Sequence, residues 1–202
     1  MTTLGMSSTG KTSIIMRLLT DRWGRFDATI GASFATYVVD EIKYEIWDTA
    51  GNERFRSLLP MYYRSTDLML MVFDLSNLDT INNLAEYLEG IMKTVKNEYR
   101  IIVVANKSDL IKGESYDKIV SDAERKVRAL FYTFTDPNIR IHTFVTVSAK
   151  DGTGFDDVRV AINTCGSEMK AIKSGKNSSL DTAFTLDTNE THRTSYTCGK
   201  YC

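Results

Sequence analysis

The sequence has few of the residues from which many metal centres and extracellular proteins are built. Its 202 residues include three cysteines and two histidines. Three cysteines cannot form a disulfide framework, so we expect the chain to fold in a reducing compartment such as the cytosol. Two histidines argue against a histidine-based metal centre and against a serine-histidine-aspartate triad.

Long hydrophobic runs and an excess of one charge are also missing. The longest apolar run covers residues 68–73, whereas a membrane-spanning helix needs about 18 residues or more. Lysine and arginine number 25 and aspartate and glutamate 26, which leaves a net charge of −1. This balance gives no reason to expect binding to nucleic acid or to an acidic membrane. We therefore expect a globular domain large enough to bury its own core.

The chain alternates between apolar runs and segments with helical spacing. Strands are predicted at residues 68–73 and 101–105, at 34–39 and 43–48 as a hairpin turning at Asp40 and Glu41, and at 140–147. Helical spacing of apolar residues recurs at residues 14–19, 84–95, 119–131 and 155–172. This alternation predicts an α/β fold, a mostly parallel six-stranded sheet with one antiparallel edge strand and helices on both faces.

The composition divides the chain into a domain at residues 1–173 and a tail at residues 174–202. The tail is rich in Ser, Thr, Asn and Asp with scattered apolar residues. Such a segment cannot bury enough apolar surface to offset the entropy of ordering it, so we predict a flexible tail.

Residues 5–12 read G-M-S-S-T-G-K-T, which matches the pattern G-x-x-x-x-G-K-[ST]. Glycines let the backbone curl so that successive N–H groups face one anion, and the following helix adds its positive end. Lys11 would reach the β- and γ-phosphates of a nucleotide, and the Thr12 hydroxyl would bind Mg²⁺. The alternative is a chance glycine turn before a surface lysine. The predicted phosphate-binding residues are Ser7, Ser8, Thr9, Gly10, Lys11, Thr12 and Ser13.

A strand should precede this loop, but only residues 1–4 stand before Gly5. Either the first strand is very short or the sequence lacks its natural start. A second polar motif, D-T-A-G, occupies residues 48–51 at the end of a predicted strand. Asp48 can hold a water bound to Mg²⁺, and the Gly51 N–H can meet a γ-phosphate. An ordinary Asx turn is the alternative for this motif.

Two further motifs follow predicted strands, N-K-S-D at residues 106–109 and S-A-K at residues 148–150. A carboxylate at Asp109 can accept two parallel N–H bonds from guanine, and adenine would leave it unpaired. The Ala149 N–H can donate to guanine O6, and the stems of Lys107 and Lys150 can cover the two faces of the base. A polar loop after a strand is the ordinary expectation for each motif alone. Four such motifs in this order predict a guanine-nucleotide site that also includes Asn106 and Ser148.

From residue 5 to residue 172 the sequence resembles a Rab protein of the Ras superfamily of small GTPases. The segments T-I-G-A-S-F at residues 29–34, I-W-D-T-A-G at 46–51 and P-M-Y-Y-R at 60–64 resemble the endosomal Rab branch. The resemblance implies that Thr29 binds Mg²⁺ and senses the γ-phosphate. It also implies that Trp23 stands against the guanine. Phe34, Trp47 and Tyr62 match the aromatic triad that Rab effectors recognise, although core packing is an alternative for these rings.

The resemblance implies a switch that binds GTP or GDP with Mg²⁺ and regulates vesicle or endosomal trafficking. Expected partners are a guanine-nucleotide exchange factor, a GTPase-activating protein, effectors, a GDP-dissociation inhibitor and a prenylation escort. We expect a monomer that cycles between the cytosol and the cytosolic face of membranes. A binding module locked with GTP, a nucleotide-free P-loop protein and a P-loop ATPase remain as alternatives. The ATPase is disfavoured by Asp109.

The sequence departs from the family pattern at several places. The hairpin at residues 34–48 is a few residues shorter than usual in Rab proteins, and one residue fewer separates Trp23 from Thr29. Asn52 replaces the glutamine that orients the attacking water, and it is shorter by one methylene, which predicts slow intrinsic hydrolysis of GTP. Residues 112–138 form an enlarged helix and loop of unassigned role. The C-terminal cysteines, Cys198 and Cys202, have neither of the usual Rab spacings and form no C-a-a-X box. We nevertheless predict prenylation at Cys202 and also at Cys198, which would supply the membrane anchor.

Overall fold

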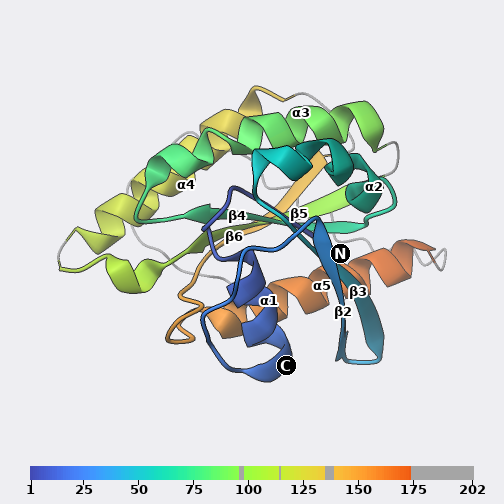
Figure 1. Cartoon of the computed structure of the whole chain (residues 1–202), viewed down its shortest axis with the longest axis horizontal. Helices are drawn as coiled ribbons and strands as arrows, with labels where there is room; N and C mark the ends of the chain where they lie inside the picture. Colours follow the sequence, from blue (N-terminus) through green and yellow to red (C-terminus); the bar gives the residue numbers. More distant parts are fainter. Residues whose placement is uncertain (96–97, 114, 135–138, 174–202) are drawn as a thin grey trace, which may run out of the picture.

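A computed structural model of the chain describes residues 1–95, 98–113, 115–134 and 139–173. This part of the chain forms one six-stranded sheet flanked by helices (Figure 1). The strands are β1 (Thr2–Leu4), β2 (Ala32–Val39), β3 (Ile42–Thr49), β4 (Leu68–Asp74), β5 (Tyr99–Asn106) and β6 (Ile139–Thr146). The helices are α1 (Lys11–Thr20), α2 (Leu59–Tyr63), α3 (Leu84–Thr94), α4 (Tyr116–Tyr132) and α5 (Phe155–Lys173), with short 3-10 helices η1 (Glu53–Leu58), η2 (Leu78–Ile81) and η3 (Ser108–Leu110).

The strand order is β2-β3-β1-β4-β5-β6, and adjacent strands are parallel except for the pair β2 and β3. This arrangement confirms the predicted fold class, and the predicted elements have ends within three residues of those observed. Because five strands run in one direction, their carboxyl ends meet at one edge of the sheet. The loops after β1, β3, β5 and β6 therefore bring the four polar motifs to the same place.

Helices cover both faces of the sheet. In Figure 1, α3 and α4 lie on one side of the strands and α1 and α5 on the other. Alternate side chains of β4 point to opposite faces of the sheet. Met69 and Phe73 pack in the core on the side of α3, and Leu70 and Val72 pack in the core on the side of α1 and α5. All of β4 is therefore buried, which explains its continuous apolar run.

The first strand has three residues, as the short segment before Gly5 predicted, and it lies in the middle of the sheet. Two of them are threonines whose buried hydroxyls are paired. Thr2 Oγ1 lies 2.6 Å from Thr66 Oγ1, and Thr3 Oγ1 donates to Asp48 Oδ1 over 3.0 Å. These bonds let a polar strand occupy a central position at low desolvation cost. They also connect β1, and thus the loop that follows it, to the end of β3.

The predicted hairpin joins β2 to β3 through Asp40 and Glu41, with Val39 paired to Ile42. Both turn residues have positive φ, 46° and 62°. Positive φ at both central residues is the conformation of the two-residue turns that match the twist of a hairpin. The turn therefore forms without the glycine or asparagine that usually supplies this conformation.

Among the described residues, no helix has the length and apolar character that crossing a membrane requires. The predicted tail at residues 174–202, with Cys198 and Cys202, lies outside the described residues. Residues 112–138 contain the helix α4, and 114 and 135–138 lie outside the described part.

Candidate functional site

The loop at residues 5–12 curls tightly between β1 and α1. Gly5 has a φ of 147° and Gly10 a φ of 93°. A Cβ added to Gly5 would lie 2.2 Å from the Val72 carbonyl oxygen, and one added to Gly10 would lie 2.2 Å from Asn106 Nδ2. Glycine is thus required at both positions by conformation and by space. The loop leads directly into α1, so its N–H groups and the positive end of the helix face the same space.

Lys11 is the buried cation of this loop. Its Nζ donates to the carbonyl oxygens of Gly5 over 2.8 Å and Met6 over 2.9 Å, so the side chain folds back over the curl. Burial lowers the pKa of Lys11 to about 8, although the nearby Asp48 carboxylate opposes the shift. A phosphate group beside Nζ would supply the negative charge that favours protonation.

The three residues predicted to bind Mg²⁺ lie together although they come from different elements. Thr12 Oγ1, on α1, donates to Asp48 Oδ2 at the end of β3 over 2.6 Å. It also lies 3.0 Å from Thr29 Oγ1, in the loop before β2. Burial raises the pKa of Asp48, against hydrogen bonds from Thr12 and Thr3 that lower it. Two hydroxyls and a buried carboxylate are hard oxygen donors, so this set fits Mg²⁺.

No group of three or more His, Cys, Asp or Glu side chains that could hold a metal exists in the described ranges. Mg²⁺ is usually bound by one or two protein oxygens together with waters and substrate phosphates. The neighbouring Gly51 lies next to the phosphate loop, since its carbonyl oxygen accepts from the Ser7 N–H over 3.0 Å.

Asn106 connects the phosphate loop to the S-A-K loop. Its Nδ2 donates to the Thr9 carbonyl oxygen over 2.8 Å, and its Oδ1 accepts from the Ala149 N–H over 3.1 Å. The amide predicted to meet guanine O6 thus has a partner within the protein. Contact between Ala149 and a guanine would require this N–H to be shared between two acceptors.

Asp109 lies at the other end of the same space. Ser148 Oγ donates to its Oδ1 over 2.7 Å, and Lys150 Nζ lies 3.7 Å from its Oδ2. Lys107 has a positive φ of 69°, and its Nζ is paired with Asp74 Oδ2 at 2.6 Å. The carboxylate predicted to select the purine is therefore held in one orientation by side chains from the S-A-K loop.

These groups line one cavity of about 460 Å³. Of the predicted nucleotide and metal residues, Thr9, Asp48 and Ser148 stand behind its wall and act through hydrogen bonds, while the others form the wall. Trp23 contributes an aromatic wall, 46 % exposed. Sequence reasoning missed five lining residues: Phe26, Asp27, Ala28, Thr49 and Leu110. Two of them carried a usable signal: Phe26, a second aromatic residue in the same loop as Trp23, and Thr49, which lies inside the D-T-A-G motif.

Asn52 reaches this cavity but is already hydrogen-bonded. Its side-chain oxygen accepts from the Arg54 N–H over 3.0 Å and caps η1. An asparagine at this position is favoured as an N-cap because its oxygen replaces a missing helical acceptor. The amide that would need to orient a water therefore has a competing structural partner.

The three predicted effector residues form a continuous aromatic row on the surface. The rings of Phe34 and Trp47 are 5.1 Å apart between centroids, and those of Trp47 and Tyr62 are 5.2 Å apart. Phe34 is 53 % exposed and Trp47 36 %, so neither ring is a core residue. The row joins β2, β3 and α2, which are the elements next to Thr29 and Gly51.

Comparison with known proteins agrees with this geometry. A family model described as Ras family matches residues 1–166. The chain belongs to the Ras family. It is 42 % identical over 111 residues to the ras-related protein Rab-5B of Dictyostelium discoideum and 40 % identical over 116 residues to the GTP-binding protein YPT53 of Saccharomyces cerevisiae. The GTP-binding protein YPTM1 of Zea mays is 27 % identical over 183 residues.

The first two matches cover 53 % and 55 % of this chain. They cover 52 % and 53 % of the two relatives, so the chain spans about half the length of these proteins. The match to YPTM1 covers 88 % of this chain and 81 % of that protein. The predicted resemblance to a Rab-type small GTPase is confirmed by the family model and these relatives. Ras-family GTPases bind GTP and GDP with Mg²⁺ and hydrolyse GTP.

Proposed function

We propose that this Ras-family protein is a guanine-nucleotide switch whose own pocket binds GTP or GDP with Mg²⁺. The supporting observation is that Asn106 bonds the phosphate loop to the S-A-K loop, whose Ser148 in turn donates to Asp109, around a single cavity. The phosphates would lie on the loop that Lys11 spans, and the base would lie between Asp109, Trp23 and the lysine stems.

The metal would be held by Thr12, by Thr29 in the GTP state and by Asp48 through a water. When bound, Mg²⁺ neutralises charge on the β- and γ-phosphates. The protein side of the switch consists of the two segments that carry Thr29 and Gly51. These segments are coupled, because the Ala50 N–H donates to the Gly31 carbonyl oxygen over 2.8 Å. A γ-phosphate that holds both segments would therefore also arrange the aromatic row of Phe34, Trp47 and Tyr62.

The experiment that tests this function is a titration with labelled GDP, GTP and ATP at fixed Mg²⁺ concentration. We expect tight binding of both guanine nucleotides and binding of ATP weaker by a factor of about 10⁴ or more, because adenine leaves the Asp109 carboxylate unpaired. Equal affinity for the adenine and guanine nucleotides would contradict the proposal.

We further propose that intrinsic hydrolysis of GTP is slow. Asn52 is shorter than glutamine and its oxygen already caps η1, so it is poorly placed to orient the attacking water. Single-turnover hydrolysis should be faster in Asn52→Gln by about ten-fold or more, because positioning is most of the catalysis in this reaction. Equal rates of GTP hydrolysis in wild type and Asn52→Gln would contradict this proposal. A GTPase-activating protein that supplies a glutamine in trans would still stimulate the natural protein.

The cellular role that fits these properties is membrane trafficking of vesicles or endosomes. The relatives named Rab-5B and YPT53 support it, as does the exposed aromatic row that would receive effectors. An exchange factor, a GTPase-activating protein and a GDP-dissociation inhibitor would complete the cycle. Membrane attachment would come from prenylation of Cys202 and Cys198, and mass spectrometry of protein from its native host would detect the isoprenoid.

A GTP-locked binding module is the second candidate, and Asn52 favours it. Nucleotide content after purification separates the two. A content of mostly GDP would indicate that the protein hydrolyses its bound GTP. A content of mostly GTP would indicate the locked module.

A further inference from the structure

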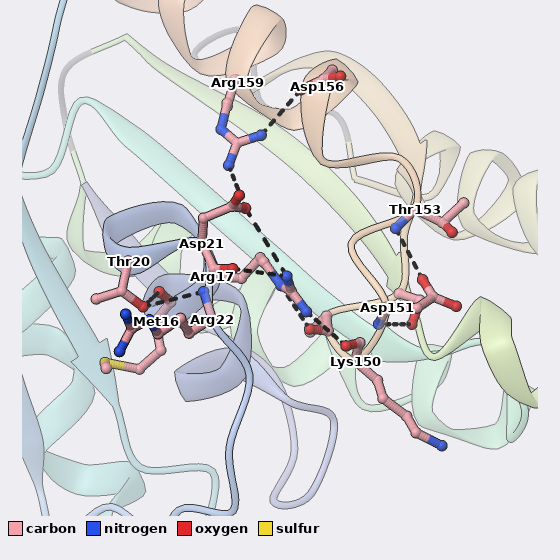
Figure 2. Close-up of polar contacts among 12 residues, drawn as sticks. Met16, Arg17, Thr20, Asp21, Arg22, Lys150, Asp151, Thr153, Asp156 and Arg159 are labelled. Atoms are coloured by element: carbon pink, nitrogen blue, oxygen red, sulfur yellow. Dashed lines mark hydrogen bonds and ion pairs between the residues drawn. The ribbon is translucent and has the colours of Figure 1, made fainter.

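Arg17 of α1 lies behind the base end of the pocket and outside its lining. Its guanidinium makes three main-chain contacts: Nε donates to the Ala149 carbonyl oxygen over 3.1 Å, Nη2 to that of Lys150 over 2.6 Å, and Nη1 to that of Asp21 over 3.0 Å. Figure 2 shows the guanidinium between Asp21 and Lys150. The Arg17 side chain is only 12 % exposed. The phosphate-loop helix is thereby bonded to the S-A-K loop at two successive carbonyls.

These contacts continue to Asp109 through a chain of hydrogen bonds. The C=O and N–H of one peptide plane point in opposite directions. Because Arg17 holds the Lys150 carbonyl, the Asp151 N–H of the same plane points away from it, and this N–H donates to Ser148 Oγ over 3.2 Å. The Ser148 hydroxyl in turn donates to Asp109 Oδ1 over 2.7 Å. Arg17 is thus connected to the purine-selecting carboxylate by one peptide and one hydroxyl.

Arg17 Nε also donates to the Ala149 carbonyl oxygen, so the Lys150 N–H of that peptide plane points away from Arg17. Gly152, whose φ is 92°, closes the turn by donating to the Ser148 carbonyl oxygen over 2.9 Å, and a Cβ added to it would lie 3.5 Å from Arg17 Nη1. Only the planar fork of arginine offers donors in these three directions at once, and a lysine ammonium on a flexible stem does not.

The network is also fixed to the far helix. Asp21 ends α1 with a φ of 56°, and its carboxylate Oδ1 accepts from Arg159 Nη2 on α5 over 3.2 Å. Arg159 is held from its other side by Asp156 at 3.0 Å. Figure 2 follows these contacts from α5 through Asp21 to the loop at residues 150–153. The position of Arg17 is therefore set by α1 and α5 together.

We propose that Arg17 is a positioning residue for guanine recognition, which sets the orientation of the S-A-K loop and, through Ser148, of the Asp109 carboxylate. This rests on the proposed function, since the base must occupy the pocket. Loss of the guanidinium fork frees the loop to turn, so GDP dissociates faster and Asp109 contacts the base less well. Arg17 itself touches no part of the nucleotide.

The test compares Arg17→Gln and Arg17→Lys with Arg22→Gln in the full chain with Mg²⁺ present. Arg22 is an exposed arginine that is close in sequence and is also drawn in Figure 2, so its replacement removes the same charge without touching the loop. The first measurement is the release rate of fluorescent GDP. We expect release about ten-fold faster in both Arg17 variants and within about two-fold of wild type in Arg22→Gln, since hydrogen bonds to charged groups have effects of this size.

The second measurement separates positioning from general loosening. Inosine diphosphate lacks the exocyclic amine of guanine, so it can use only one of the two bonds to Asp109. If Arg17 orients this carboxylate, the affinity ratio of GDP to inosine diphosphate falls in the Arg17 variants, by about five-fold for loss of most of one hydrogen bond. Ser148→Ala removes the last link without changing Arg17 and should lower the same ratio.

An unchanged ratio in the Arg17 variants, or release as slow as in wild type, would overturn the positioning role while leaving the proposed function intact. Wild-type protein that does not prefer GDP to ADP would overturn both. If Arg17→Gln does not fold, as judged by thermal melting, Arg17→Lys and Ser148→Ala carry the same two measurements.

Discussion

The buried Lys11 should make the affinity of the proposed GDP site depend on pH. Burial lowers the pKa of the Lys11 ammonium to about 8, well below its ordinary value. Phosphates beside Nζ would favour the charged form, so we expect the pKa of Lys11 to rise when GDP binds. Above pH 8 the free protein has lost a proton that the complex keeps. Binding then takes up a proton, and affinity must fall as pH rises.

The size of the effect follows from the titration of a single group. A group with a pKa of about 8 is about nine-tenths protonated at pH 7 and about one-tenth at pH 9, so the apparent dissociation constant of GDP should rise about ten-fold between them. This corresponds to about 1.4 kcal/mol of binding free energy. Calorimetry at pH 9 in two buffers of different ionisation enthalpy should also count close to one proton taken up for each GDP.

Lys11→Met is the matched control for this titration, because the base of GDP itself begins to ionise near pH 9. The variant should bind GDP more weakly at every pH, since it lacks the ammonium at the phosphates. It should also lack the ten-fold loss between pH 7 and pH 9 apart from whatever the nucleotide contributes. The same pH dependence in wild type and in Lys11→Met would refute the assignment of a lowered pKa to Lys11.

Three other substitutions probe separate parts of the site. Asp109→Asn should weaken GDP binding by about 100-fold or more and shift preference to xanthosine diphosphate in competition binding, because the amide N–H can donate to the xanthine oxygen. Thr29→Ala should weaken GTP binding and its Mg²⁺ dependence while changing GDP binding little, which titrations of both nucleotides would reveal. Gly10→Ala should lower the thermal midpoint and abolish binding, since its Cβ would lie 2.2 Å from Asn106 Nδ2. Retained GDP affinity in Gly10→Ala would contradict the tight curl of the loop.

The Asn106 bridge illustrates a limit of sequence reasoning at this site. The N-K-S-D motif predicts Asn106 as a site residue and guanine as the class of ligand. Yet the motif gave no sign that Asn106 would bond to Thr9 and Ala149 at once, because these partners are 97 and 43 residues away in the chain. Arg17 carries no sequence signal for the same reason, since the carbonyls of Ala149 and Lys150 reach it only through the turn after β6.

The local sequence pattern was sufficient to predict the fold class and most of the residues that line the cavity. The phosphate loop, the short first strand and the two-residue hairpin turn each depend on neighbouring residues, whose spacing is printed in the sequence. The packing of β4 between two cores likewise follows from its unbroken apolar run. Tertiary structure alone decided which side chains meet across the sheet edge: Thr12 with Thr29 and Asp48, Ser148 with Asp109, and Arg17 with the S-A-K loop. Such pairs depend on strand order and on the direction of each side chain, and hydrogen bonds form only when folding brings their atoms within about 3 Å.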